Sequence, residues 1–180
     1  GFVGDGGVNE GIFHEVLNMA AIWNLPVIYV IENNLYGAST HVELICRLKD
    51  LADRAAAYGI PGVVVDGNDV LEVHRVAGEA ISRAREGKGP TLIEAKTYRI
   101  GGHSRTDANT YRRKEEEKLW LQRDPIRLFE ARMLEQKILD PAQIQELGAE
   151  IDAMIEDAVE RAQQAPDPSP DDVLNYVTCE

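Results

Sequence analysis

The length, composition and charge of the chain exclude several classes of protein. With 180 residues, 44% of them hydrophobic and 28% charged, the chain can bury the core of a medium-sized globular domain. Its formal net charge of −12 argues against a nucleic-acid surface, which needs clustered Lys and Arg. No apolar run approaches the ~18 residues needed to cross a bilayer. We therefore expect neither a nucleic acid nor a membrane as a partner.

The cysteines and the first residues bear on where the protein works and how complete the sequence is. Cys46 and Cys179 lie far apart and lack the spacing of metal ligands, which favours a reducing intracellular compartment. The chain has no initiator Met, and Gly1–Val3 resembles the last residues of a strand. We expect a fragment of a longer polypeptide.

The first 37 residues predict a strand, a helix and a second strand. Residues 2–3 end a strand, and the Gly-Asp-Gly-Gly sequence of residues 4–7 predicts a flexible turn. Apolar periodicity predicts a helix over residues 10–23, and the β-branched run of residues 27–31 predicts a buried strand. Such a βαβ unit is almost always right-handed, with its two strands parallel.

The lengths of these elements bring two polar residues together. A helix of ~14 residues advances ~21 Å, and the returning strand recovers most of this at ~3.3 Å per residue. Asp5 and Asn34 should therefore meet at the carboxyl edge of the sheet, where open α/β folds bind ligands. Either residue alone could be an ordinary turn or cap residue. Together they offer the oxygen ligands that Mg²⁺ prefers, and the N–H groups of Gly6 and Gly7 can receive phosphate oxygens.

The rest of the chain continues the α/β pattern and then becomes helical. We expect a mostly parallel sheet with flanking helices in residues 1–112, and a helical C-terminal extension in residues 113–180 with a Pro-rich linker at 165–170. The further elements expected are a helix over 49–58 ended by Gly59, a strand over 62–65, a helix over 70–84 capped by Asn68 or Asp69, a strand over 91–97, a polar loop to about Arg112, and helices beginning at Asp124-Pro125 and Asp140-Pro141.

Three further residues stand out within these elements. Trp23 and Trp120 are expected to be core residues on helix faces. Glu94 stands in the middle of a predicted strand, and the sequence offers no reason for a charge there.

Several motifs resemble those of a known family. The segments Gly4-Asp5-Gly6, Asn9-Glu10-Gly11, Glu32-Asn33-Asn34 and Tyr36-Gly37 resemble the thiamine-diphosphate motif. More narrowly, the chain resembles the alpha subunit of the decarboxylase component of thiamine-diphosphate-dependent 2-oxo acid dehydrogenases, of the pyruvate and acetoin type. The further segments that carry this resemblance are residues 53–59, 65–69, 88–99, 102–104 and 124–125. It covers nearly the whole chain, as the C-terminal portion of such a subunit.

The resemblance implies a thiamine-diphosphate-binding fold of the diphosphate-binding type, and a site that holds both Mg²⁺ and thiamine diphosphate. Asp5, the Asn34 side chain and the backbone carbonyl of Tyr36 would ligate the metal. The amides of Gly6 and Gly7 would hydrogen-bond the diphosphate.

His103 is the remaining site residue that the resemblance implies. An exposed loop histidine is its ordinary interpretation, but the preceding Tyr98-Arg99 and the Gly101-Gly102 hinge favour a functional one. The resemblance implies that His103 binds the diphosphate, orders the loop over the cofactor and acts in catalysis. Family members often have a bulky or basic residue where this chain has Ile100 and Gly101, so loop contacts to the cofactor should be fewer here.

The implied activity is that of an oxidoreductase that decarboxylates or cleaves its substrate and passes the acyl group to a lipoyl disulfide. The implied partners are a beta subunit, which supplies the cofactor-activating glutamate in an α2β2 heterotetramer, and a lipoyl-bearing acyltransferase. The implied location is a bacterial cytoplasm in preference to a mitochondrial matrix. Two alternatives stay open: a non-catalytic domain that binds Mg-phosphate or serves assembly, and a transketolase-like thiamine-diphosphate enzyme, which the Pro-rich exit disfavours.

Overall fold

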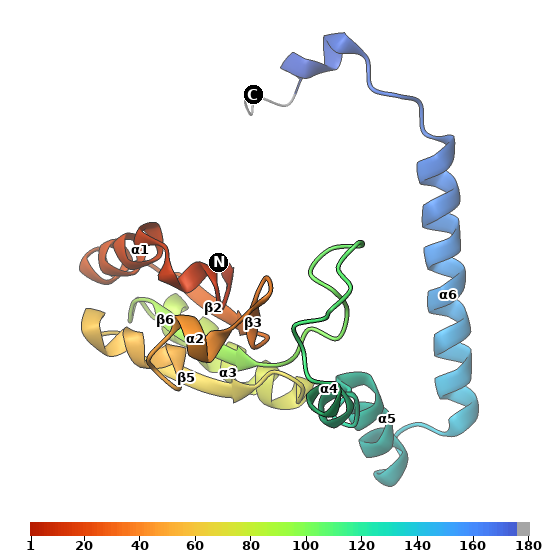
Figure 1. Ribbon diagram of the computed structural model, residues 1–180, viewed down its shortest axis with the longest axis horizontal. Helices are drawn as coiled ribbons and strands as arrows, with labels where there is room; N and C mark the ends of the chain where they lie inside the picture. The colour runs from red at the N-terminus through yellow and green to blue at the C-terminus, as the bar shows by residue number, and fades with distance from the viewer. Residues whose placement is uncertain (176–180) are drawn as a thin grey trace. The chain divides into compact units, whose positions relative to one another are not determined.

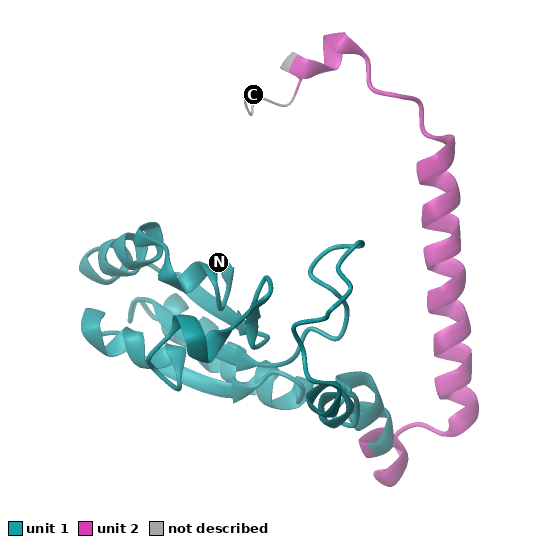
Figure 2. Cartoon of the chain, in the orientation of Figure 1, with its two compact units in different colours: residues 1–131 teal, residues 132–180 magenta. Residues whose placement is uncertain are grey.

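A computed structural model describes residues 1–175, and for Leu174 it describes the backbone alone. The chain forms two compact units. The first unit comprises residues 1–131 and the second begins at Arg132 (Figures 1 and 2). The domain boundary expected at residues 112 and 113 stays a prediction. Cys179 lies outside the described residues.

A parallel sheet organises the first unit. Its strands, in spatial order, are β1 (Phe2–Gly4), β2 (Ile28–Asn33), β6 (Thr91–Lys96) and β5 (Gly62–Asp66). All three pairings are parallel, with Gly4 opposite Glu32 and Ile31 opposite Glu94. A separate antiparallel pair consists of β3 (Tyr36–Gly37) and β4 (Thr40–His41). The mostly parallel α/β fold expected from the sequence is confirmed.

Helices follow the strands much as the sequence predicts. The α-helices are α1 (Gly11–Ile22), α2 (Val42–Ile45), α3 (Val70–Arg85), α4 (Lys114–Leu121), α5 (Pro125–Glu135) and α6 (Pro141–Gln164), and the 3-10 helices are η1 (Gly7–Asn9), η2 (Leu51–Tyr58) and η3 (Pro170–Leu174). The segment predicted as a helix over residues 49–58 is the 3-10 helix η2. Gly59 ends it in a left-handed conformation with φ of 67°, as predicted.

The sheet is covered on both faces. On one face, Leu92 of β6 packs in a core cluster that includes Leu17 of α1 and Leu51 of η2. On the other face, Ile93 packs with Val76 of α3. Because successive side chains of a strand point to opposite faces, β6 contributes to both clusters. The helices therefore hold the central strands β2 and β6 firmly between two layers (Figure 1).

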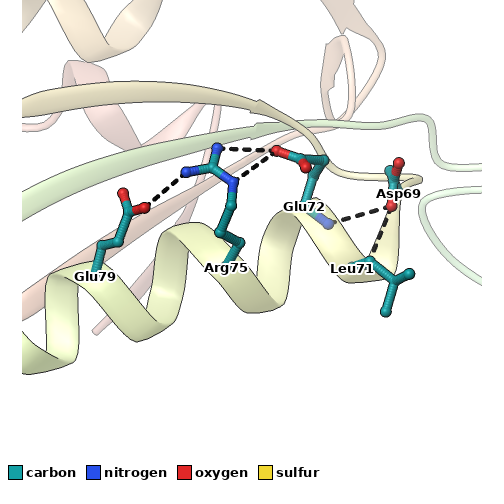
Figure 3. Close-up of polar contacts among 5 residues, drawn as sticks. All are labelled: Asp69, Leu71, Glu72, Arg75 and Glu79. Atoms are coloured by element: carbon teal, nitrogen blue, oxygen red, sulfur yellow. Dashed lines mark hydrogen bonds and ion pairs between the residues drawn. The ribbon is translucent and has the colours of Figure 1, made fainter.

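The N-terminus of α3 is capped by Asp69. Its carboxylate accepts hydrogen bonds from the N–H groups of Leu71 at 3.0 Å and Glu72 at 3.2 Å (Figure 3). Farther along the exposed face, Arg75 forms ion pairs with Glu72 at 2.9 Å and Glu79 at 2.8 Å. The cap confirms one of the two predicted alternatives, whereas exposed ion pairs of this kind contribute little to stability.

The prediction that Trp23 is a core residue is wrong, since 61% of it is exposed. Helix α1 buries only the stripe of Phe13, Leu17 and Ala20. Trp23 follows the last residue of this helix and lies off that stripe. Trp120 is half-buried, and its ring stacks on Tyr98 with 5.5 Å between centroids.

The second unit is dominated by α6. Asp140 and Gln143 form a capping box at its start, with Pro141 at the first helical position, as the sequence predicts. None of its residues is buried within the described part of the chain. No helix of residues 1–175 combines the length and the apolar character needed to span a bilayer.

Candidate cofactor site at the carboxyl edge of the sheet

Asp5 lies directly after β1, with only 1% of its surface exposed. Burial raises the pKa of its carboxyl group, and the N–H groups of Gly6, Asn34 and Leu35 and the guanidinium of Arg99 offset this in part. Its Oδ2 atom has no hydrogen-bond partner among the described residues. A buried carboxylate oxygen without a partner is costly, so this position suits a bound cation.

The turn after β2 carries the other two candidate ligands. Asn33 Oδ1 accepts a hydrogen bond from the N–H of Leu35 at 3.2 Å, and Asn34 Oδ1 accepts one from the N–H of Tyr36 at 3.3 Å. Leu35, which lies between Asn34 and Tyr36, has φ of +73°. This value is rare for a bulky side chain and is typical of constrained functional turns. Since β1 and β2 are parallel neighbours, this turn and Asp5 share one sheet edge.

Backbone contact between two glycines joins the turns that follow β1 and β2. A Cβ atom added at Gly6 would lie 3.2 Å from the Cα of Gly37, and one added at Gly37 would lie 3.1 Å from the Cα of Gly6. A Cβ atom at Gly7 would lie 2.8 Å from a methyl carbon of Val3. Glycine therefore permits the close approach of Asp5 to the residues around Tyr36.

Arg54 of η2 braces the first of these turns. Its guanidinium donates hydrogen bonds to the Val8 carbonyl and, at 2.7 Å, to Asn9 Oδ1, both in η1. It also contacts His14 Nε2 at 3.1 Å, and His14 Nδ1 lies 2.6 Å from the hydroxyl of Tyr58. This network connects η1, α1 and η2 beside the Gly6-Gly7 turn.

Arg99 connects the long polar loop to the turn after β2. One end of its guanidinium donates to the Tyr36 carbonyl at 3.3 Å and contacts His103 Nδ1 at 3.2 Å. The other end donates to the Ala38 carbonyl at 2.6 Å and to the Tyr111 hydroxyl at 3.0 Å. Because Arg99 can only donate, neutral His103 must carry its proton on Nε2, which leaves this N–H for another acceptor.

The end of the loop is held by Arg112 in a cluster of tyrosine rings. Only 7% of Arg112 is exposed, and its guanidinium carbon lies 5.3, 5.1 and 5.6 Å from the ring centroids of Tyr36, Tyr98 and Tyr111. It donates one hydrogen bond, to the Ile100 carbonyl at 3.2 Å. The arginine is thus held by cation–π contacts, which strengthen when the cation is desolvated.

Asp107 closes the loop on itself. Its carboxylate accepts hydrogen bonds from the Tyr111 hydroxyl at 2.6 Å and from the N–H groups of Asn109 and His103, each at 2.9 Å. These bonds lower the pKa of Asp107 to about 2. The loop that sequence reasoning left without internal structure is therefore organised around one carboxylate and two arginines.

Glu94 proves to be a fully buried residue behind the site. Its carboxylate accepts hydrogen bonds from Asn33 Nδ2 at 2.7 Å and from the N–H of Ala52 at 2.9 Å. The sequence could not reveal these partners, because one lies 61 residues away and the other is a backbone group.

The candidate metal ligands thus comprise one carboxylate, one amide oxygen and one main-chain carbonyl. No group of three or more His, Cys, Asp or Glu side chains in the described residues could hold a metal ion by itself. The structure brings Asp5 close to the turn that carries Asn34 and Tyr36, and Arg99 links His103 to Tyr36. The roles of these residues stay predictions.

Comparison with known proteins reveals similarity along almost the entire chain. A family model described as Dehydrogenase E1 component matches residues 1–171. The alpha subunits of acetoin:2,6-dichlorophenolindophenol oxidoreductase from Cupriavidus necator and Bacillus subtilis are each 46% identical, over 98% of this chain and 53% of the relative. The pyruvate dehydrogenase E1 component subunit alpha of Porphyra purpurea is 39% identical, over 98% of this chain and 51% of the relative. The chain spans about half the length of these curated relatives.

Proposed function

The chain belongs to the dehydrogenase E1 component family, which depends on thiamine diphosphate, and on this premise we propose that it is part of the alpha subunit of a 2-oxo acid or acetoin dehydrogenase. The proposed reaction decarboxylates a 2-oxo acid or cleaves acetoin and transfers the acyl group to a lipoyl disulfide. The acetoin type is favoured, because its relatives are 46% identical to this chain and the matched pyruvate dehydrogenase subunits are 36–42% identical.

The observation that carries the proposal is the unpartnered Oδ2 of buried Asp5. We propose that this oxygen, the Asn34 amide oxygen and the Tyr36 carbonyl ligate Mg²⁺, a hard cation that takes oxygen ligands. Arg99 uses one lone pair of the Tyr36 carbonyl, so the second is available to a metal. The N–H groups of Gly6 and Gly7 would receive diphosphate oxygens.

The proposed role of His103 follows from its contact with Arg99. Thiamine diphosphate, when bound, supplies the nucleophilic carbon for the reaction, and the protein supplies orientation and electrostatics. In this proposal, His103 directs its Nε2–H toward a diphosphate oxygen, while Arg99 fixes the imidazole through Nδ1. The loop would thereby be held over the cofactor.

The proposed partners follow from the alpha-subunit assignment. We propose that a beta subunit completes the site in an α2β2 assembly and supplies the cofactor-activating glutamate, and that a lipoyl-bearing acyltransferase accepts the acyl group. The bacterial origin of the acetoin relatives supports a bacterial cytoplasm as the location.

The test is calorimetric titration of the complete subunit, assembled with its beta partner, with thiamine diphosphate in the presence and absence of Mg²⁺. Asp5→Ala and Asn34→Ala are expected to abolish Mg²⁺-dependent binding, whereas Asp167→Ala, an exposed control, leaves it unchanged. Unaltered affinity in either site variant would refute the metal assignment. Turnover of acetoin, pyruvate and a branched-chain 2-oxo acid by the same assembly then identifies the substrate.

A further inference from the structure

Glu94 is a buried charged residue that the proposed site does not use. It lies in the central strand β6 with none of its surface exposed. Both of its hydrogen-bond partners, Asn33 Nδ2 and the N–H of Ala52, are donors. A carboxylate satisfies both donors at once, whereas the amide of a glutamine would present its NH₂ group to one of them. Because a buried charge is costly, its position calls for a specific explanation.

The first partner connects Glu94 to the turn that carries the proposed metal ligands. Asn33 is 2% exposed. Its side-chain nitrogen faces Glu94, so its side-chain oxygen must face the opposite way. That oxygen accepts the N–H of Leu35, the residue with φ of +73°. If the amide were reversed, its NH₂ group would face the Leu35 N–H. Glu94 therefore fixes the orientation of Asn33, and Asn33 stabilises the turn.

The second partner connects Glu94 to the turn that carries the proposed diphosphate donors. Ala52 lies in the first turn of η2, and Arg54 follows two residues later. Arg54 donates to the Val8 carbonyl and to Asn9 Oδ1 in η1, directly after Gly6 and Gly7. No acidic side chain among residues 1–175 forms an ion pair with Arg54. Its other polar contacts are with His14 Nε2 at 3.1 Å and Cys46 Sγ at 3.6 Å.

We propose that Glu94 is a positioning residue that sets the Asn34–Tyr36 turn and the Gly6-Gly7 turn in register with each other. Through Asn33 it orients the metal turn, and through η2 and Arg54 it orients the diphosphate turn. The backbone contact of Gly6 with Gly37 transmits any displacement of one turn to the other. This inference rests on the proposed function, since it assigns Glu94 a role in building that site.

The decisive variant is Glu94→Gln in the complete subunit assembled with its beta partner. The oxygen of the introduced amide can accept from Ala52, but the introduced NH₂ group then faces the NH₂ group of Asn33. The Asn33 amide has to turn over, and the N–H of Leu35 loses its hydrogen bond to Asn33 Oδ1. We expect the Kd for Mg²⁺, measured at saturating thiamine diphosphate, to rise about 10- to 100-fold, the range typical of residues that orient metal ligands.

A second substitution should reverse this effect. In Glu94→Gln/Asn33→Asp, one carboxylate oxygen at position 33 accepts from the new amide and the other accepts from Leu35. The double variant is therefore expected to recover most of the Mg²⁺ affinity. Asn33→Asp alone places two buried carboxylates against each other, so an assembly with this variant should bind Mg²⁺ poorly. The exposed Glu79→Gln on α3 (Figure 3) removes the same charge and should change nothing at the site.

Amide hydrogen exchange of the cofactor-free assembly provides a readout that does not depend on binding. Glu94→Gln should accelerate exchange in residues 33–37, whereas Glu94→Gln/Asn33→Asp should restore the slow exchange. Unchanged exchange in 33–37, or acceleration that is as large in β5, would overturn the inference. If the unaltered assembly binds the cofactor and Glu94→Gln leaves the Mg²⁺ affinity unchanged, the inference is overturned as well.

Two outcomes separate this inference from the proposed function. If the unaltered assembly binds no thiamine diphosphate, the proposed function fails, and exchange in residues 33–37 still decides whether Glu94 sets the turn. If Glu94→Gln does not fold, Arg54→Gln tests the second connection by faster exchange in residues 6–9 and weaker cofactor binding. Unchanged values of both in Arg54→Gln would overturn the inference.

Discussion

At the scale of single residues, Asp5 combines burial with an unsatisfied oxygen. Because its pKa in the folded state is raised above the ordinary 3.8, the folded chain favours the neutral form. The stability associated with this shift is present below pH 3.8 and is lost as the pH rises through the folded-state pKa. Above that pKa the metal-free protein therefore carries a destabilising charge, which a bound cation would compensate.

Asp5→Asn should separate stability from binding. Without its charge, the metal-free chain is expected to gain about 1 kcal/mol in free energy of unfolding, because burying an ionised carboxylate costs more than burying the neutral amide that replaces it. For a chain of this size the melting temperature should rise by about 2–4 °C. Calorimetric unfolding with a chelator present measures the gain, and adding Mg²⁺ and thiamine diphosphate should no longer stabilise the variant. A lower melting temperature without metal would contradict this account, and Asp167→Asn is the exposed control.

At the scale of elements, the βαβ unit was predictable because only a few combinations of helix and strand length bring the second strand back beside the first. The sequence also predicted the end of η2 at Gly59 and the start of α6 at Asp140-Pro141, where these residues give local signals. The exposure of Trp23 was not predictable from apolar periodicity, which does not define how wide a stripe the sheet covers. The partners of Glu94 were hidden because they arise from strand pairing across the fold.

The order within the long loop was also missed, although the sequence contains a signal for it. A Tyr-Arg pair begins the loop at residues 98–99, and another ends it at 111–112. Each pair contributes one ring to the cluster around Arg112 and one arginine that ties down the loop. The pairing was not evident beforehand, because Tyr36 from β3 is needed to complete the cluster.

Arg112→Lys should loosen the loop without unfolding the sheet. A lysine keeps the charge but loses the planar guanidinium that lies over three rings and donates to Ile100. We expect trypsin to cleave after the exposed Arg105 several-fold faster, since cleavage follows the population of open loop. The exposed neighbour Arg113→Lys is the matched control. Equal cleavage rates in the two variants would exclude Arg112 as the anchor.

The same loop should respond to acid through Asp107. Its pKa of about 2 lies below the ordinary value of 3.8, so its stabilising effect is complete above pH 3.8 and is lost as the pH falls toward 2. NMR signals from the amides of His103 and Asn109 should shift over this range, because both donate to the carboxylate. Asp107→Asn should remove the acid-dependent change. Amide signals that do not respond as the pH falls from 3.8 to 2 would refute this assignment.

At the scale of the whole molecule, the two units differ in how much apolar surface they bury. The first unit has a core on both faces of its sheet. Helix α6 has exposed apolar side chains along its length, at Leu147, Ile151, Met154, Ile155 and Val159. In the described residues this helix has no buried residue, so its stability depends mainly on local interactions.

Amide hydrogen exchange of the 180-residue chain should therefore be faster in the second unit than in the sheet of the first. The amides of α6 are expected to exchange by local opening, orders of magnitude faster than those of β2 and β6, which exchange only on wider unfolding. Mass spectrometry of peptic fragments measures both in one sample. Equal protection of α6 and β6 would contradict this expectation. The capping box at Asp140 should slow exchange at the helix start, so Asp140→Ala provides a check within α6.

The contact between Gly6 and Gly37 also bears on how this protein family can vary. A Cβ atom on either glycine would lie 3.1–3.2 Å from the Cα of the other, so the two backbone segments leave little room and an added residue in either turn would push the other aside. Insertions between Gly4 and Val8, or between Asn33 and Gly37, should therefore be excluded from functional homologues. The loop from Ile100 to Tyr111 is exposed over much of its length and should accept changes in length more readily. In a collection of related sequences, gaps should thus be absent at the carboxyl ends of β1 and β2.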